Sequence, residues 1–509
     1  MLAELDDAVY VEVFLEGEMN AAFKRFQKNI RETLDEFRVY SGNRLQYTFT
    51  DPATALSQKA RSEFMNELIS KGIQPTNVVD EKDGQRVERL LFPGAIISYA
   101  GAEIAVNLFK GGQSASLLSK QEIINQAVEK IEFELASAIY KLSNAERKSI
   151  GWLQGHGELG GLETASIMAE MESLYDVNFI GLQSAEELQT YDVLVLARPL
   201  KSFNNREKFL LDQYLMRGGK LLMMLNAFQV NIDSASADQY FPPMIDHSLD
   251  DMLFRYGLRI NKNMVQDRLS TKFPVVTGMA GSAPQMQMLD WYFFPLINNY
   301  PAHLITRNLD AVQLRFASSI DTVKATGVNK MPLMLSSPYM RLLNAPVNVS
   351  ANELRNTRIN EMQQPVALAY LLEGNFTSVF KNRFLPEGFN TADFKGESLP
   401  TKMIVVADGD LARNDINART NQAQPLGKDP YAAIFYANQD FIMNALAYLT
   451  ASDGLITTRN KEIKIRPLDK QKIAEEKLYW QLLNLISPVL LIVLFGVLRA
   501  AWRKRKFGR

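Results

Sequence analysis

Two short stretches of the sequence combine glycines with side chains that can do chemistry. The first is Gly155-His156-Gly157-Glu158, which directly follows an apolar segment. An imidazole exposed at such a turn can contact a ligand and titrate near neutral pH. His156 is therefore the best single candidate for a ligand contact, with Glu158 beside it. The stretch lacks the G-x-G-x-x-G spacing of a pyrophosphate site, and a tight strand-to-helix turn that needs small residues is the more common cause of such a pattern.

The second stretch is Asp408-Gly409-Asp410, with Asp415 close behind. Three carboxylates at the end of a strand are suited to a hard cation. The stretch has only the D-G-D core of the calcium-loop pattern, however, and Asp side chains that cap the next turn are the favoured explanation. Together the two stretches define a candidate ligand cleft formed by His156, Glu158, Asp408 and Asp410.

Familiar catalytic machinery is missing from the sequence. The chain has no Cys, which excludes disulfides, thiolate metal sites and cysteine nucleophiles. It has neither the G-x-S-x-G motif of a hydrolase nor the Walker A motif that ATP hydrolysis requires. Its three His residues include no pair with the i,i+4 spacing of a metal-binding helix. We expect no enzymatic activity, no cofactor and no metal, although a Ser-His-Asp set assembled in space stays open.

Charge and composition narrow the class of protein further. The formal net charge is −1, and no basic stripe occurs outside the C-terminal tail, so nucleic acid is not an expected partner. With 47% hydrophobic and 22% charged residues, the chain is typical of globular domains rather than of disordered or many-span proteins. The absence of Cys suits an exported bacterial protein, but only as a weak indication.

Residues 1–145 predict a thioredoxin-like α/β domain. Alternating apolar residues indicate its strands, and apolar residues at helical spacing indicate its helices. The predicted elements are a strand at 8–15, a helix at 19–40, a strand at 45–52, a helix at 57–70, two paired strands within 86–109 and a helix at 119–142. The resulting order, β-α-β-α-β-β-α, is that of a thioredoxin-like layer. Without a Cys-x-x-Cys pair, thiol chemistry is excluded.

Residues 146–455 predict a doubly wound domain of the flavodoxin-like or class I glutamine-amidotransferase-like kind. Apolar strands alternate with helices, which indicates a parallel sheet covered on both faces. The predicted strands are 149–158, 177–182, 192–199, 220–226 and 402–415, the last with a polar end, and the predicted helices are 164–174, 204–217 and 439–450. Such sheets bind ligands at the carboxyl ends of their strands, where His156 and Asp408 fall.

A long insertion at about 240–400 interrupts this pattern. It is rich in Pro, Asn and Met, and we expect it to pack onto the edge of the sheet. Its aromatic stretch 289–300 (LDWYFFPLINNY) could stack on a sugar or hold a partner, but core packing is the better explanation.

The C-terminal region predicts a membrane anchor. Residues 478–498 contain no charged side chain, and a bilayer core needs about 20 apolar residues in a helix. We expect a juxtamembrane linker at 456–477, a transmembrane helix at 478–502 and a basic tail at 503–509. Three kinds of residue would serve this helix: interfacial aromatics, small or polar packing residues and a kinking proline. The interfacial aromatics are Tyr479, Trp480 and Trp502. The packing residues are Asn484, Ser487 and Gly496, and the kinking proline is Pro488.

The orientation of the anchor follows less directly from charge. Basic residues in the tail favour a cytoplasmic C-terminus, but the other flank is basic too. The flanking basic residues are Lys464, Arg466, Lys470, Lys472 and Lys477 on one side and Arg499, Arg503, Lys504, Arg505, Lys506 and Arg509 on the other. The start, MLAELDDAVYVEV, has no signal pattern. We expect either a tail-anchored cytosolic protein or a chain that lacks its N-terminal signal anchor.

Long phrases of the sequence resemble one known family. They are DAVYVEVFLEGEMNAAFKRFQKNIRETLDEF, YDVLVLARPLKSFNNREKFLLDQYLMRGGKLLMMLN, NLDAVQLRFASSID, VVADGDLARND and KIRPLDKQKI. In these phrases the chain is similar, over essentially its whole length, to the gliding-motility-associated ABC transporter auxiliary proteins of Bacteroidota (the GldG family), sometimes labelled substrate-binding. None of the phrases is a catalytic motif.

The resemblance implies an accessory subunit that acts with a separate membrane permease and, through it, a separate ATPase. It also implies a bacterial inner-membrane location, a periplasmic bulk, a cytoplasmic C-terminus and a second membrane helix ahead of the first strand. That helix is not in this sequence, which agrees with the missing export signal. The alternatives are a periplasmic ligand-binding module, for a saccharide for example, and a cytosolic-facing tail-anchored scaffold.

Overall fold

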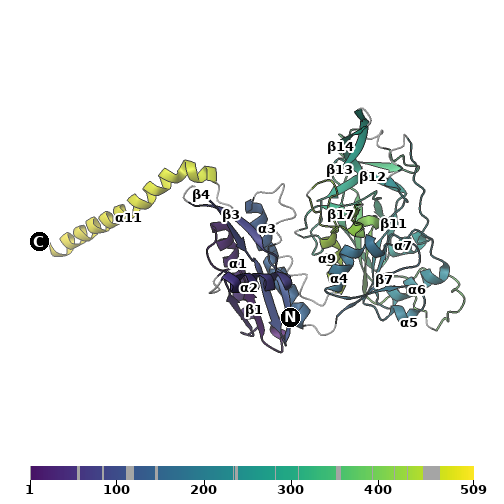
Figure 1. The fold of residues 1–509 in the computed structure, drawn as a ribbon, viewed down its shortest axis with the longest axis horizontal. Helices are drawn as coiled ribbons and strands as arrows, with labels where there is room; N and C mark the ends of the chain where they lie inside the picture. The colour runs from purple at the N-terminus through teal and green to yellow at the C-terminus, as the bar shows by residue number, and fades with distance from the viewer. Residues whose placement is uncertain are drawn as a thin grey trace. The chain divides into compact units, whose positions relative to one another are not determined.

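The computed structural model divides the chain into two compact units, Met1–Lys461 and Glu462–Arg509, and each is described by itself. Figure 1 shows the ribbon of both. The structure describes residues 2–53, 58–82, 85–109, 120–143, 147–232, 234, 239–280, 283–307, 309–350, 357–392, 394–417, 419–432, 434–450 and 470–508.

The first part of unit one is a four-stranded sheet in the order β2-β1-β5-β6. Its elements are η1 (Leu2–Glu4), β1 (Val9–Val13), α1 (Ala21–Tyr40), β2 (Leu45–Phe49), α2 (Gln58–Ser70), β5 (Gly94–Tyr99), β6 (Ala102–Asn107) and α3 (Lys120–Ser143). β1 is parallel to β2, and β5 is antiparallel to both β1 and β6. Helices α1 and α3 share one buried cluster with β1, whereas Leu68 of α2 packs in a different one. This is the predicted thioredoxin-like order.

One hairpin in this region differs from the prediction. Residues 86–109 contain the predicted pair of strands, but they begin with most of a further strand, β4 (Gln85–Leu91), which ends before Pro93 and pairs with the unpredicted β3 (Thr76–Lys82). Only β5 and β6 pair within that range. The sequence does carry a hairpin signal, Asp83-Gly84, between β3 and β4.

The second part of unit one contains a nine-stranded sheet with a parallel core. The parallel core and its connections are β7 (Ser149–Leu153), η2 (Gly161–Glu163), α4 (Ala165–Glu172), β8 (Asp176–Ile180), α5 (Ala185–Leu188), β9 (Val193–Ala197), α6 (Asn205–Met216), β10 (Lys220–Met224), β20 (Thr401–Val406), η4 (Gly409–Ala412) and α9 (Asn438–Thr450). The core strands lie in the order β8-β7-β9-β10-β20 and all run parallel. In chain order this is 2-1-3-4-5, the flavodoxin-like arrangement.

Both faces of this core are covered, as its apolar strands require. Alternate residues of β9 point to opposite faces, and Val193 and Val195 share a buried cluster with α4 and α9. Leu194 and Leu196 pack instead with α5, α6 and α7 (Asp250–Tyr256). The fully buried strands explain why the sequence shows continuous apolar runs here. The α/β fold class is confirmed.

The insertion does more than pack onto the sheet edge. Its strand β19 (Ala367–Gly374) pairs antiparallel with β20 and so continues the sheet. The other strands of the insertion are β11 (Leu258–Ile260), β12 (Asn263–Asp267), β13 (Ser270–Ala280), β14 (Ala283–Ile297), β15 (Val312–Gln313), β16 (Ile320–Thr322), β17 (Val328–Leu335) and β18 (Met340–Asn344), and the short strands β21 (Ile416–Asn417) and β22 (Gln422–Ala423) follow β20. Of these, β11, β16 and β17 also belong to the sheet. The exact limits of the domains stay predictions.

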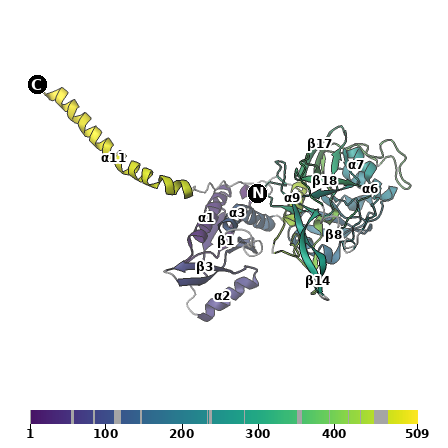
Figure 2. The same ribbon diagram turned by 90° about the horizontal axis from the view of Figure 1, so that it is seen from above.

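The aromatic stretch 289–300 is mainly core, as expected. Trp291 and Phe293 are buried in a cluster with Phe316 and with Met264 of β12. The same stretch forms the inner half of β14, which pairs with β13 in a long hairpin. Figures 1 and 2 both show this hairpin extending beyond the rest of its domain.

The second unit is the helix α11 (Lys470–Phe507), which begins inside the predicted juxtamembrane linker. Its segment Gln481–Arg503 is long and apolar enough to cross a membrane, and none of this segment is buried against protein. Pro488 lies within the helix, and a Cβ on Gly496 would meet no other atom within 4 Å. The side chains of Asn484, Ser487 and Trp502 are exposed. Tyr479 and Trp480 belong to α11, but their side chains lie outside the described part.

Candidate functional site

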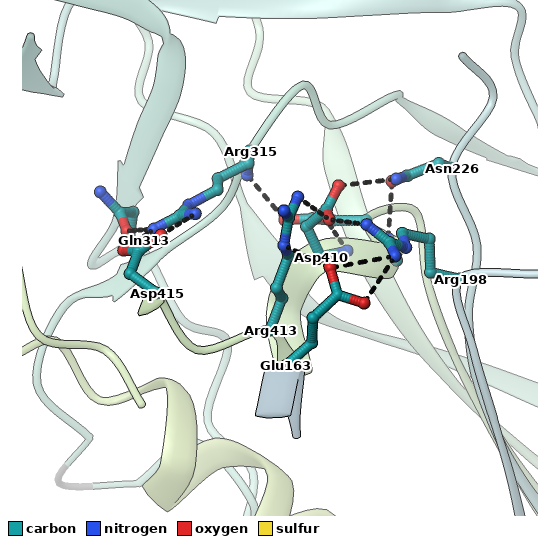
Figure 3. Close-up of polar contacts among 10 residues, drawn as sticks. Glu163, Arg198, Asn226, Gln313, Arg315, Asp410, Arg413 and Asp415 are labelled. Atoms are coloured by element: carbon teal, nitrogen blue, oxygen red, sulfur yellow. Dashed lines mark hydrogen bonds and ion pairs between the residues drawn. The ribbon is translucent and has the colours of Figure 1, made fainter. Parts of the chain in front are cut away.

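The carboxyl edge of the parallel sheet gathers charged side chains from several strands. Arg198 directly follows β9, Asn226 follows β10, Asp410 follows β20, and Glu163 ends the short helix η2 after β7. Because parallel strands end at one edge, residues far apart in sequence meet there. Figure 3 shows them pointing toward one another.

Four of the charges at this edge form a closed ring, called here the ion-pair ring (Glu163, Arg198, Asp410, Arg413). The guanidinium of Arg198 lies 3.3 Å from Asp410 Oδ1 and 3.1 Å from Glu163 Oε2. Arg413 contacts the same two carboxylates, with Nε 3.1 Å from Glu163 Oε1 and a terminal nitrogen 3.5 Å from Asp410 Oδ1. Asn226 Nδ2 donates to Asp410 Oδ2 over 2.8 Å. Each positive group thus has two negative neighbours.

The backbone is adapted to this ring at one glycine. Arg198 has a φ of +54°, which is unusual for a residue with a side chain. A Cβ added to Gly409 would lie 2.8 Å from both Cα and Cβ of Arg198. The glycine in Asp408-Gly409-Asp410 is therefore needed for close approach to Arg198, and its role is packing.

Asp408, two residues before Asp410 of the ring, is completely buried. Its Oδ1 accepts from the backbone N–H of Asp410 and its Oδ2 from that of Arg315, over 2.8 and 2.7 Å. Asp408 is the N-cap of η4, so the predicted turn-capping role is confirmed. Burial, followed by the nearby charge of Asp410, raises the pKa of Asp408 to about 8.

Asp415 does not join Asp408 and Asp410 in a cation site. Its carboxylate pairs with the guanidinium of Arg315 through two hydrogen bonds of 3.0 and 2.7 Å. Gln313 accepts a further, longer bond from Arg315. Within the described residues, no group of three or more His, Asp or Glu side chains is placed to hold a metal ion.

The structure corrects the expectation that His156 is exposed. Its ring is buried and stacks on Phe203, with the ring centroids 3.8 Å apart. Nε2 lies 3.1 Å from Glu207 Oε2, and Nδ1 lies 3.3 Å from Glu158 Oε1. Glu158 also accepts from the backbone N–H of His156 over 2.6 Å. The ring of Phe203 and the first turn of α6 cover the imidazole, so it is held between two carboxylates.

The four residues of the predicted cleft therefore belong to two clusters. In the described part of the chain, no side-chain hydrogen bond or ion pair joins His156 and Glu158 to Asp408 and Asp410. Ligand binding by these residues remains a prediction.

Sequence reasoning missed most of the ion-pair ring. Arg198, Glu163 and Arg413 belong to no recognised motif. One signal was available for Arg198 and Asn226, since each directly follows an apolar strand, VLVLA or LLMML. The carboxyl ends of parallel strands are where functional polar residues collect. Glu163 and Arg413 lie in loops, and nothing in their local sequence indicates the pairing.

A separate open pocket of about 560 Å³ lies between α7, β11 and the ends of β12 and β18. Its lining includes the half-exposed ring of Phe254 together with Asp250, Arg259, Lys262 and Asn344. Lys262 Nζ lies 3.4 Å from Asp250 Oδ2 across the pocket. These residues are distinct from those of the predicted cleft.

Comparisons with known proteins and family models indicate which proteins this chain is similar to. A comparison with curated proteins finds no match. A solved structure titled "mmIFT52 N-terminal domain" matches 60% of this chain and 99% of its own, at 13% identity and a TM-score of 0.36, which supports no inference about this chain. Residues 1–98 match a domain of unknown function.

Residues 147–445, which include the whole parallel core, match the family described as "ABC-type uncharacterized transport system". The matched range contains every member of the ion-pair ring. Because this match spans more than half of the sequence, the chain belongs to this family of auxiliary components of ABC-type transport systems.

Proposed function

We propose that this chain is a non-catalytic, membrane-anchored, extracytoplasmic accessory subunit of an ABC transporter complex linked to gliding motility. It acts with a separate permease and, through it, a separate ATPase. The bulk of the chain lies in the periplasm, and α11 crosses the inner membrane with its basic end in the cytoplasm. The family match supports the transport role, and the sequence resemblance supports the link to motility.

The ion-pair ring is the observation that carries the non-catalytic part of this proposal. Doubly wound sheets bind ligands at their carboxyl edge, and here that edge holds two arginines and two carboxylates that contact one another. A carboxylate whose oxygens already contact two guanidinium groups is not placed to take a proton from a substrate, because general-base catalysis needs a free oxygen within hydrogen-bond reach of that proton. The edge is organised as a fixed, charge-balanced structure, which suits a scaffold.

Co-purification of the native complex tests this proposal. The tagged full-length chain, extracted from native membranes in mild detergent, should bring down a multi-span permease and an ATPase in fixed ratio. His156→Ala and Asp408→Ala should leave that ratio unchanged in the folded fraction of each variant, because both side chains are buried inside the domain and do not face a partner. Recovery of the wild-type chain as an isolated monomer would refute the proposal.

The pocket beside Phe254 favours a second candidate function, a ligand-binding module of the same transporter. An aromatic ring flanked by amide and charged side chains can stack on and hydrogen-bond a saccharide. Calorimetric titration with a panel of defined oligosaccharides tests this. Binding that Phe254→Ala abolishes and Phe179→Ala retains would support it, since both phenylalanines are about half exposed but lie on different elements.

A further inference from the structure

The open pocket beside α7 is lined by three charged side chains, and each of them has an opposite charge next to it. Lys262 Nζ lies 3.4 Å from Asp250 Oδ2, and both residues line the pocket. The guanidinium of Arg259, the third charged lining group, lies 2.6 Å from the carboxylate of Asp321 on β16. The four charges sum to zero, so the pocket offers a charged ligand no unpaired counter-ion.

The uncharged polar groups of the pocket are asparagine amides. Asn263 is buried and engaged with Ser319, because its Nδ2 donates to Ser319 Oγ over 2.9 Å and its Oδ1 accepts from the Ser319 backbone N–H over 3.0 Å. Asn261 donates to the same hydroxyl through Nδ2, which leaves its Oδ1 able to accept from a ligand. Asn344 is exposed at the end of β18, and no side-chain hydrogen bond in the described part of the chain engages it. Asn261 and Asn344 can therefore hydrogen-bond a ligand.

The wall that α7 contributes to the pocket includes two apolar side chains. Leu253 is buried and forms part of the wall, and the ring of Phe254 is about half exposed beside it. Ile260 of β11 adds a third apolar side chain. A ligand in the pocket thus meets carbon atoms from α7 and β11 and amides from the residues after β11 and from β18.

These properties together describe one class of small molecule. A hydroxyl group both donates and accepts hydrogen bonds, as an asparagine amide does. A pyranose ring carries hydroxyls around its rim and C–H groups on its faces, which can lie against an aromatic ring. The pocket volume of about 560 Å³ falls within the usual range for small-molecule sites. An acidic sugar would bring a carboxylate that finds no free cation, and its desolvation would be costly.

We infer that this pocket binds an uncharged saccharide and that Asp250 determines the preference by neutralising Lys262. The inference rests on the second candidate function proposed above, a ligand-binding module of the transporter, and adds the charge class of its ligand. Without the carboxylate of Asp250, Lys262 could pair with the carboxylate of an acidic sugar. Specificity of this kind depends on a group that acts against the wrong ligand as well as on contacts with the right one.

Pairs of trisaccharides that differ in charge test the inference. Neutral trisaccharides of glucose, mannose and galactose are each compared with the triuronate of the same stereochemistry and linkage. The full-length chain is titrated calorimetrically in a detergent without a sugar headgroup, at about 50 mM salt, where charge effects are only weakly screened. We expect at least one neutral trisaccharide to bind about tenfold more tightly than its triuronate, which is 1.4 kcal/mol in binding.

The variant Asp250→Asn tests the role of the carboxylate directly. It keeps the side-chain shape but frees Lys262, so the affinity for the triuronate should rise about fivefold or more, whereas that for the neutral trisaccharide should change less than about twofold. The rise should disappear at about 1 M salt, where the Debye length is about 3 Å. Asp176→Asn is the matched control, because Asp176 is similarly exposed and ion-paired but lies on β8, at the opposite edge of the sheet from β11.

A second variant, Lys262→Met, gives a readout of the opposite sign. It removes the cation and leaves Asp250, so the triuronate should bind still more weakly while the neutral trisaccharide binds as before. The changed side chains are exposed or half-buried, so all three variants should keep the wild-type thermal midpoint within about 2 °C.

Several outcomes would overturn the inference. A triuronate that binds the wild-type chain as tightly as its neutral counterpart, or an Asp250→Asn variant that changes both affinities equally, would do so while the second candidate function stands. If no trisaccharide binds, or if Phe254→Ala leaves binding intact, the second candidate function fails and the inference fails with it. The accessory-subunit proposal is decided separately, by co-purification.

Discussion

At the scale of single residues, Arg198 is the more buried of the two arginines in the ion-pair ring. It lies between Asp410 and Glu163 and is mostly buried. Arg198→Ala would leave two partly buried carboxylates with only Arg413 beside them. We expect this change to lower the free energy of unfolding by about 2–3 kcal/mol, since breaking a buried ion pair costs more than its net contribution. Urea denaturation at neutral pH measures the change.

An exposed arginine of the same domain provides the control for this prediction. Arg255 lies on α7 with its side chain exposed, and Arg255→Ala should change the free energy of unfolding by less than about 0.5 kcal/mol. Equal destabilisation by the two alanine variants would show that the ion-pair ring makes no special contribution.

His247 predicts a pH dependence of stability. Its ring is buried and Nε2 donates to the carbonyl of Pro199 over 3.2 Å. Burial, the main cause, lowers the pKa of His247 to about 4. The unfolded chain therefore takes up a proton first as the pH falls below 6.5. The stabilisation is fully present above pH 6.5 and is lost as the pH falls toward 4. Between pH 7 and pH 5 we expect a loss of about 2 kcal/mol.

The variant His247→Gln isolates this contribution from other titrating groups. It keeps a donor near Pro199 but cannot take up a proton in this range. Chemical denaturation of both proteins at pH 7, 6 and 5 should show a smaller slope for the variant. Parallel curves would mean that other groups cause the pH dependence.

The role of a single residue could be predicted from the sequence only where its partners lie close to it along the chain. Asp408 caps a turn two residues ahead, and that role follows from the Asp-Gly-Asp pattern itself. The burial of His156 depends on Phe203 and Glu207, which are brought beside it only when β9 and α6 are in place. The ion pairs of Arg198 could not be predicted locally either, because its partners come from η2 and η4.

At the scale of elements, Asp212 joins three segments that are distant in the sequence. It lies on α6, is fully buried and accepts from Ser378 Oγ, the Val379 backbone N–H and the Tyr256 hydroxyl, over 2.7, 3.0 and 2.9 Å. Asp212→Ala would leave these buried donors without an acceptor. We expect it to lower the free energy of unfolding by about 3 kcal/mol or more.

A milder substitution at the same position serves as the control. Asp212→Asn keeps the shape and one acceptor oxygen, so it should cost clearly less than the alanine change. Thermal unfolding of both variants, read at neutral pH, would show the order. If alanine and asparagine destabilise equally, packing rather than hydrogen bonding determines the effect.

The elements themselves were largely predictable where their patterns are local. The parallel strands β7, β9, β10 and β20 are continuous apolar runs between helices, and each was expected. The insertion was not resolved in this way, because β19 finds its place beside β20 only through long-range antiparallel pairing. Local periodicity contains no information about which edge a distant strand joins.

At the scale of the whole molecule, the candidate membrane span of α11 is apolar, and its described side chains are not buried within their own unit. Leu491 and Phe495 are 65% and 66% exposed, and both lie within the candidate span Gln481–Arg503. Such a helix is stable only when lipid or another apolar helix surrounds it. An arginine at the centre of such a helix has the opposite effect, because moving its charged side chain into the bilayer costs about 2.5–3.5 kcal/mol.

The contrast between apolar and charged side chains in the bilayer leads to a prediction about membrane attachment. Leu491→Arg with Phe495→Arg should shift the full-length chain from the carbonate-resistant membrane pellet to the soluble fraction. The combined cost, about 5–7 kcal/mol, exceeds what the remaining apolar residues of the segment readily offset. Leu491→Ala with Phe495→Ala shortens the same side chains without adding charge, and should leave most of the protein in the pellet. If the arginine variant stays in the pellet as fully as the alanine variant, α11 does not hold the chain in the membrane, and attachment must come from another part of the protein or from its partners.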